Sequence, residues 1–290
     1  MEVHERISEA HPAFRKRQHS IEQFTARSIV SGLAERTTRR LITIPVVVHV
    51  VYKRDEENIS DEQIHSQIDV LNKDYTAANI DKTGVPPVWQ GLVANANIQF
   101  ALATKNPRGK KTTGITRTPT TRDGFGTGDA VKSEKRGGAD PWPSARFLNI
   151  WTCNLKGGLL GYAQFPGGPA KTDGVVILYT AFGTTGVAAA PFNLGRTATH
   201  EIGHWLNLRH IWGDRNDCGG SDYCSDTPNA QLPNYNKPTF PHISCNNGPN
   251  GDMFMNYMDY VDDDAMFMFT PAQAARMNAA LAGPRKAIGG

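Results

Sequence analysis

Three histidines and one glutamate around position 200 have the spacing of a catalytic metal site. The segment from His200 to His210 reads HEIGHWLNLRH. On a helix, His200 and His204 lie four residues apart and share one face, so both imidazoles can reach a single ion. Glu201 is not placed to bind that ion, and we expect it to act as a general base that takes a proton from the attacking water.

The third histidine needs a change of chain direction to join the other two. His210 lies too far along to share their face on a straight helix, so the chain is expected to turn near Asn207. Asparagine is one of the few non-glycine residues that tolerate the left-handed backbone of such a turn. Structural zinc sites usually contain Cys and four protein ligands, whereas this motif contains no Cys. We therefore predict a catalytic zinc ion bound by the three histidines.

The composition of the 290-residue chain excludes some classes of function. A net charge of +3 is too small to indicate a nucleic-acid partner, and no apolar run reaches the length of a membrane span. Four cysteines fit disulfide bonds in an oxidising compartment. We expect a secreted or extracellular protein, although residues 1–20 show no signal peptide. That leaves export by another route, a signal removed before residue 1, or a protein that stays inside. The oligomeric state does not follow from the sequence.

Residues 1–40 differ from the rest of the chain. They are basic and contain few large apolar side chains, with clusters at 15–17 and 39–40. The segment is interpreted as a helical or partly ordered extension, and the alternative is a solvated basic tail. Residues 41–290 are expected to form the catalytic domain.

The remaining pattern predicts an α+β fold. Strands are expected at 41–52, 98–103, 147–152, 174–179 and, as a short edge strand between glycine-rich turns, 161–165. Pro45 indicates that the first half of the first strand is not centrally paired. Residues 182–190 and most of 213–252 are expected to be loops.

Three helices are predicted from caps and apolar spacing. The first begins after Ser60, with Gln63 reaching back in a capping box, and its apolar face contains Ile64, Ile68, Leu71 and Tyr75. The second spans about 195–207 and carries the histidines. The third spans 270–281, where Thr270 is the N-cap and Gln273 completes the same pattern.

The histidine segment resembles the motif HExxHxxGxxH of metzincin zinc peptidases. Met258 follows at a suitable distance and resembles the methionine of the tight turn beneath the metal site in that clan. Four segments together resemble the pappalysin family, including ulilysin-type enzymes: 204–206, 211–214, 226–228 and 258–260. The resemblance covers roughly 41–281. It implies a mixed twisted sheet with two long helices in an N-terminal lobe, and an irregular C-terminal lobe that ends in a helix.

The resemblance also implies roles for single residues. Tyr260, two residues after Met258, is expected to help stabilise the oxyanion. Asn207 replaces the usual glycine of the motif, which the turn tolerates. Cys218 and Cys245 match a family disulfide, whereas Cys153 and Cys224 are left over and are either free or paired with each other.

The resemblance implies an endopeptidase that prefers Arg or Lys on the C-terminal side of the cut. Ulilysin-like relatives use an acidic residue just past the Met-turn for this purpose, and the spacing from Met258 favours Asp263. The alternative is a solvated acidic loop. The same preference suggests that 1–40 is a pro-segment removed by cleavage before Arg39 or Arg40. No Cys precedes Cys153, so blocking of the zinc by an N-terminal Cys, as in some relatives, is excluded for these residues.

A calcium site is the second metal expectation. Asp222, Thr227 and the backbone of Ser225 lie in a loop that binds calcium in similar relatives. The alternative is a simple Asp-rich turn.

Two other functions remain open on the sequence. One is a non-catalytic, zinc-containing protein of the same fold that binds peptides. The other is a zinc hydrolase of a non-peptide amide. A groove beside an edge strand such as 161–165 would favour peptides, which bind by strand addition.

Overall fold

The β-branched run after residue 41 forms the central strand β1 (Ile42–Tyr52) of the computed structural model, which describes residues 6, 8–9, 12–38 and 40–288. β1 pairs in parallel with β2 (Ile98–Leu102), β3 (Ile115–Pro119) and β4 (Leu148–Cys153). Pro45 pairs with β2, and β4 joins only from Val46 onward. The missing N–H of this proline therefore interrupts no central pairing, as predicted.

The sheet ends in the expected short strand. β6 (Val175–Leu178) is parallel to β4, and β5 (Gly161–Ala163) is antiparallel to β6 at the edge, in the order β2-β1-β4-β6-β5. β5 is shorter than the predicted 161–165. The sequence reading missed β3, because its residues are half-exposed or exposed and lack an apolar run.

The first predicted helix is α4 (Asp61–Tyr75), and its expected apolar face is buried. Ser60 caps it by accepting from the Gln63 backbone N–H at 3.2 Å. The capping box was wrong, because the Gln63 side chain binds the 179–187 loop instead of reaching back. It donates to the carbonyls of Tyr179 and Phe182, which ties α4 to the segment before the histidines.

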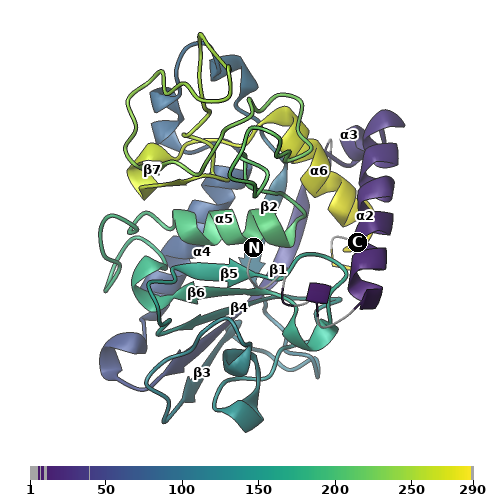
Figure 1. Cartoon of the computed structure of the whole chain (residues 1–290). Coiled ribbons are helices and arrows are strands. Elements are labelled where there is room, and N and C mark those ends of the chain that lie inside the picture. The colour runs from purple at the N-terminus through teal and green to yellow at the C-terminus, as the bar shows by residue number, and fades with distance from the viewer. Residues whose placement is uncertain (1–5, 7, 10–11, 39, 289–290) are drawn as a thin grey trace.

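The histidine helix α5 (Arg196–Trp205) lies over β5 and β6 and beside α4 (Figure 1). It ends two residues earlier than predicted, because Asn207 has φ 75°. A large apolar cluster fills the space between the sheet, α4, α5 and the C-terminal lobe. A second cluster covers the opposite face of the sheet around Trp151.

The C-terminal lobe is irregular, as expected. Before α6 (Pro271–Ala282) it includes the short strands β7 (Tyr235–Asn236) and β8 (Tyr260–Val261) and a 3-10 turn at Asp263–Ala265. Thr270 and Gln273 form the predicted capping box of α6. Cys218 and Cys245 form a disulfide, with Cα atoms 5.2 Å apart. Cys153 and Cys224 are free, buried thiols, so they do not pair with each other.

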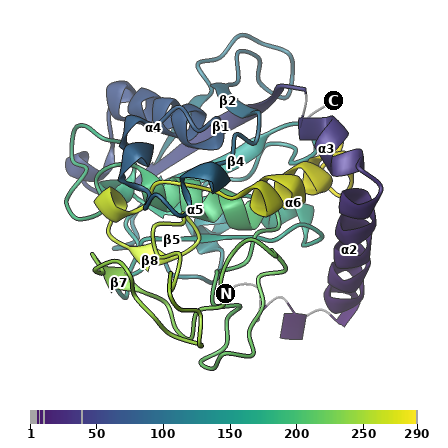
Figure 2. The ribbon, with the colours of Figure 1, turned by 90° about the horizontal axis from the view of Figure 1, so that it is seen from above.

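Residues 12–38 of the N-terminal extension are folded. α2 (Pro12–Val30) and α3 (Leu33–Thr38) pack against α6 (Figure 2). Phe14 is fully buried in the cluster around Trp151. A solvated tail was therefore the wrong alternative for residues 12–38. Among the described residues, no helix is both long and apolar enough to cross a bilayer.

Candidate active site

The three predicted histidines converge on one point. The Nε2 atom of His210 lies 3.0 Å from that of His204 and 3.2 Å from that of His200. Nitrogens that share one tetrahedral zinc ion lie roughly 3.3 Å apart. Within the described part of the chain, these residues are the only group of three or more His, Cys, Asp or Glu side chains arranged to hold a metal.

The opposite nitrogen of each ring has its own acceptor. His200 Nδ1 donates to the Tyr257 carbonyl at 2.7 Å, and His204 Nδ1 donates to the Leu208 carbonyl at 2.9 Å. His210 Nδ1 donates to the Asp214 carboxylate at 2.5 Å. Because Nδ1 carries the proton, each neutral ring directs a lone pair from Nε2 into the site. Burial favours the neutral form by lowering the pKa of all three, that of His200 to about 4.

The turn and the methionine lie where the sequence predicted them. Asn207 is fully buried, with the left-handed backbone that returns the chain toward His210. Met258 lies beneath α5, and a Cβ added to Gly203 would come within 2.5 Å of its sulfur. A larger residue at position 203 would therefore have to displace the buried Met258 side chain.

Glu201 lies between the histidines and the edge strand. A Cβ on Gly161 of β5 would lie 2.9 Å from Glu201 Cγ, so the two elements are in close contact. Burial raises the pKa of Glu201 to about 7. A carboxyl group with such a pKa can both accept and return a proton near neutral pH.

Tyr260 forms part of an aromatic group at the same site. Its ring centroid lies 4.8 Å from that of His210 and 5.5 Å from that of His200. Burial raises the pKa of its hydroxyl further above the ordinary value, so the group stays protonated and can donate. The Asp259 carboxylate accepts from the Tyr260 backbone N–H at 2.8 Å and fixes this position.

A cavity of about 400 Å³ opens beside the histidines, lined by Glu201, Tyr260, Asp263 and Arg196 among others. Asp263 is 1% exposed, so a fully solvated acidic loop is excluded at this position. Its Oδ2 accepts from the backbone N–H groups of Leu194 and Arg196 at 2.8 and 3.2 Å. Asp263 therefore caps the N-terminus of α5 from another part of the chain, a role that the sequence reading missed.

Two of the three proposed calcium residues, Asp222 and Thr227, are hydrogen-bonded to each other. Thr227 Oγ1 donates to Asp222 Oδ2 at 2.7 Å, and the Cys224 N–H donates to Asp222 Oδ1 at 2.9 Å. Ser225 is exposed. Calcium at this loop stays a prediction.

Sequence reasoning also missed two groups that surround the third histidine. Asp214 binds His210, and Trp212 stacks on its ring with centroids 4.1 Å apart. Asp214 lies four residues after His210, a spacing that could have suggested the pair. The buried Arg196 before the motif carried no comparable signal, since its partners come from residues 74, 81 and 257.

The fold and the histidine site define a metallopeptidase, and comparisons with known proteins agree. The peptidase family described as pregnancy-associated plasma protein-A matches residues 132–282. An extracellular metalloprotease of Pyricularia oryzae is 34% identical over 250 residues, covering 83% of this chain and 75% of that protein. Extracellular metalloprotease 1 of Coccidioides posadasii is 31% identical over 273 residues, covering 89% of this chain and 84% of that protein. The chain belongs to this pappalysin family of metalloendopeptidases.

Two solved structures from Tannerella forsythia are similar along most of the chain. Mature mirolysin in complex with a cleaved peptide is 49% identical, with a TM-score of 0.85, and covers 86% of this chain and 96% of that chain. A promirolysin mutant is 45% identical, with a TM-score of 0.91, and covers 99% of this chain and 94% of that chain. The expected α+β metzincin-like fold is confirmed.

Proposed function

We propose that this protein is a zinc-dependent endopeptidase that prefers Arg or Lys on the C-terminal side of the cut. The observation that carries the proposal is the position of Glu201, beside three converging imidazoles and against an edge strand. The metal of the family is assigned to His200, His204 and His210, because three neutral nitrogen donors suit zinc.

The metal supplies Lewis-acid chemistry when bound, lowering the pKa of a water molecule and polarising the substrate carbonyl. The chain supplies the proton transfers. Glu201 accepts the proton of the attacking water and returns it to the leaving amine. The protonated Tyr260 hydroxyl donates to the oxyanion, a contribution that preorganised donors make in many hydrolases.

The edge strand supports a peptide substrate. Among the described strands β5 pairs only with β6, which leaves its other edge open, and Gly161 and Leu160 line the cavity. An extended peptide can add to this edge through main-chain hydrogen bonds. That arrangement favours peptides over small amides, and an intact Glu201 argues against the non-catalytic binding protein.

Asp263 is the proposed selector for the residue after the cut. It lines the same cavity as Glu201, and both described hydrogen bonds to its carboxylate use Oδ2. A buried carboxylate favours a cationic side chain by direct pairing.

Residues 1–40 are proposed to be a pro-segment of the 41–290 catalytic domain. The mature relative covers 86% of this chain and the pro-form relative 99%, a difference of 13%, which is about 38 of 290 residues. Arg40 is exposed just before β1, and Arg39 lies outside the described residues. None of the described residues before position 41 is among those that line the cavity beside the histidines.

Secretion and calcium binding complete the proposal. The curated relatives are named extracellular proteases, and the disulfide fits an oxidising compartment. Calcium is proposed at Asp222, Ser225 and Thr227. Calorimetry with added calcium tests this site, and an absence of binding heat would remove it.

The deciding experiment is digestion of a peptide library with and without a zinc chelator, read by mass spectrometry. Chelator-sensitive cuts before Arg or Lys are expected. Chelator-sensitive cuts elsewhere would support the peptidase assignment but contradict the preference for Arg or Lys. No cuts from zinc-loaded protein that lacks residues 1–39 would favour the peptide-binding alternative.

A further inference from the structure

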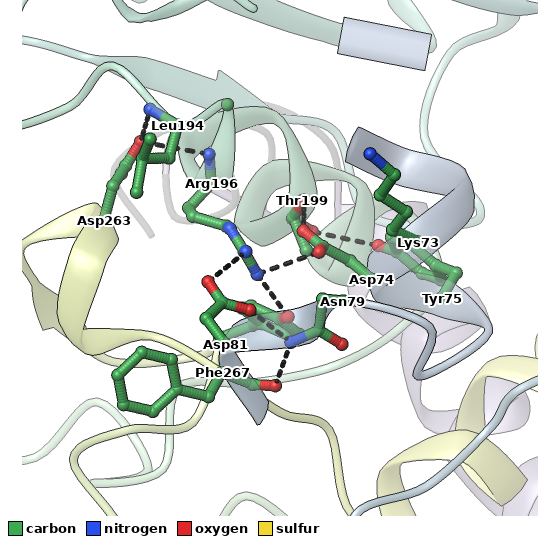
Figure 3. A network of polar contacts seen from close by, with 12 residues as sticks. Lys73, Asp74, Tyr75, Asn79, Asp81, Leu194, Arg196, Thr199, Asp263 and Phe267 are labelled. Atoms are coloured by element: carbon green, nitrogen blue, oxygen red, sulfur yellow. Dashed lines mark hydrogen bonds and ion pairs between the residues drawn. The ribbon is translucent and has the colours of Figure 1, made fainter. Parts of the chain in front are cut away.

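The cavity beside the histidines contains a positive charge next to the proposed selector. The Arg196 backbone N–H donates to Asp263 at 3.2 Å, and both residues line the cavity. Figure 3 shows the Arg196 guanidinium pointing away from Asp263, toward Asp74 and Asp81. A cationic substrate side chain that reaches Asp263 therefore enters a site where the protein already has a cation.

Two carboxylates hold this guanidinium. Arg196 Nη1 lies 2.8 Å from Asp74 Oδ1, and Nη2 lies 2.7 Å from Asp81 Oδ2. Nη1 also donates to the Tyr257 hydroxyl. The Arg196 side chain is 7% exposed and that of Asp74 1%, so these charges interact in a weakly screened environment.

Each carboxylate is itself held in place. Thr199 Oγ1 donates to Asp74 at 2.6 Å from α5. Asn79 Nδ2 donates to Asp81 at 2.7 Å and to the Phe267 carbonyl at 3.0 Å (Figure 3). The two acceptors are thus oriented before any substrate binds, one by the histidine helix and one by the C-terminal lobe.

The balance of charge decides what Asp263 can attract. Arg196 with Asp74 and Asp81 carries one positive and two negative charges, so its cation is more than compensated. If one partner were neutral, the long and flexible Arg196 side chain could pair with Asp263 or repel an incoming cation. In either case the selector would lose attraction for Arg or Lys.

We propose that Asp74 and Asp81 are positioning residues for substrate selection, which hold the Arg196 guanidinium away from Asp263 and so leave that carboxylate available to a cationic side chain. This inference rests on the proposed preference for Arg or Lys.

The test measures kcat/KM for two peptides that differ only in the residue after the cut, Arg or the uncharged isostere citrulline. Asp81→Asn is the main variant, because the Asp81 side chain is 31% exposed and asparagine has the same shape. We expect the Arg-to-citrulline ratio to fall about tenfold, the scale of one changed charge at the edge of a protein interior. Asp74→Asn, in the buried position, is expected to lower the ratio in the same direction.

The matched control is Asp69→Asn. Asp69 is an exposed carboxylate on α4, the helix that also carries Asp74. The substitution removes the same charge at a distance and should leave the ratio unchanged. The triple variant Asp74→Asn, Asp81→Asn, Arg196→Met removes the cation together with its partners, and the ratio should recover. A purely structural role would lower cleavage of both peptides together and would not reverse.

The outcomes separate the inference from the proposed function. No chelator-sensitive cleavage of either peptide by zinc-loaded protein that lacks residues 1–39 would overturn the peptidase assignment. A wild-type ratio near one would overturn the preference and this inference together. A high wild-type ratio that Asp263→Asn abolishes, but that neither Asp81→Asn nor Asp74→Asn lowers, would overturn this inference alone.

Discussion

The Asn207 side-chain amide donates a hydrogen bond to the Glu22 carboxylate at 3.1 Å, which joins the turn of the three-histidine segment to helix α2. Glu22 also accepts from Arg276 Nη2 at 2.9 and 3.0 Å, and the same nitrogen donates to the Asn207 carbonyl at 3.2 Å. The extension therefore contacts the residue that replaces the family's usual glycine. Glu22 therefore links helix α2 to the turn that brings His210 back to the other two histidines.

The first prediction concerns this bond. Asn207→Gly removes a hydrogen bond to a carboxylate, which contributes about 1.5–3 kcal/mol to stability. Glycine adopts the native φ of 75° more easily than asparagine, and this gain offsets part of the loss. In full-length protein we expect a net loss of about 1 kcal/mol in the free energy of unfolding. In protein lacking residues 1–39 the same change should be neutral or slightly stabilising. Denaturant unfolding of both forms checks this, and equal losses in both would refute the coupling.

The second prediction separates the proton acceptor from the metal ligands. Glu201→Ala removes a general base and should lower kcat by a factor of about 10²–10⁴. Metal content should stay unchanged, because Glu201 does not belong to the converging group. Zinc analysis of the purified variant and a peptide assay give the two readouts. Full activity in the variant would contradict the role of Glu201, and loss of metal would contradict the division of roles.

The third prediction concerns the support of His210. Asp214→Asn weakens the hydrogen bond that fixes the His210 ring, and such losses lower metal affinity by about 10–100-fold. Competition with a chromogenic chelator measures the affinity. Asp217→Asn is the matched control, since Asp217 is exposed in the same loop and pairs with Arg215. An affinity unchanged by Asp214→Asn would show that Trp212 stacking alone orients the ring.

The sequence predicted the elements whose signal is local. β1 was predicted from a β-branched run and α6 from the capping box of Thr270 and Gln273, and both formed close to the expected residues. The convergence of His200, His204 and His210 could be predicted equally well, because it follows from the helical repeat and one left-handed residue. The same short segment contains Glu201, whose role as general base stays a prediction.

The missed features depend on pairing between distant segments. β3 has no apolar alternation and exists because it pairs with the second half of β1. The Gln63 side chain donates to carbonyls more than 110 residues away and therefore does not reach back to cap α4. The cap on α5 comes from Asp263, and the partners of Arg196 come from α4 and the segment that follows it. No short window of sequence contains both members of such pairs.

The fourth prediction is a pH dependence of substrate choice. Burial raises the pKa of Asp263 to about 6, while its two backbone donors and the nearby Arg196 charge oppose the shift and Asp262 adds to it. Above this pH the carboxylate is ionised and attracts Arg; below it the group is protonated and the attraction is lost. The Arg-to-citrulline ratio should therefore fall as pH drops from about 7.5 to about 5. Burial also raises the pKa of Asp74 to about 6, so the loss of its charge lowers the ratio over the same range.

The control for this prediction is Asp263→Asn, which keeps an oxygen to cap α5 but carries no charge. Its ratio should be low and independent of pH. Titration of Glu201 affects both peptides alike and cancels in the ratio. A wild-type ratio that stays constant across this range would exclude Asp263 as the titrating selector.

The fifth prediction is self-processing of the extension. The proposed preference and the exposed Arg40 together predict cleavage before Arg39 or Arg40, which releases residues 1–38 or 1–39. Intact-mass spectrometry of incubated wild-type protein should show this loss, whereas Glu201→Ala should keep its full mass. Replacing Arg39 and Arg40 together by Gln should also prevent the cut without affecting cleavage of an added peptide. Identical masses for wild type and Glu201→Ala would contradict self-processing, and a cut that persists in the Gln variant would contradict selection by these arginines.

Because α2 and α3 pack on α6 and bind Arg276 through Glu22, the released segment should dissociate slowly, and size-exclusion chromatography after cleavage measures how much remains bound.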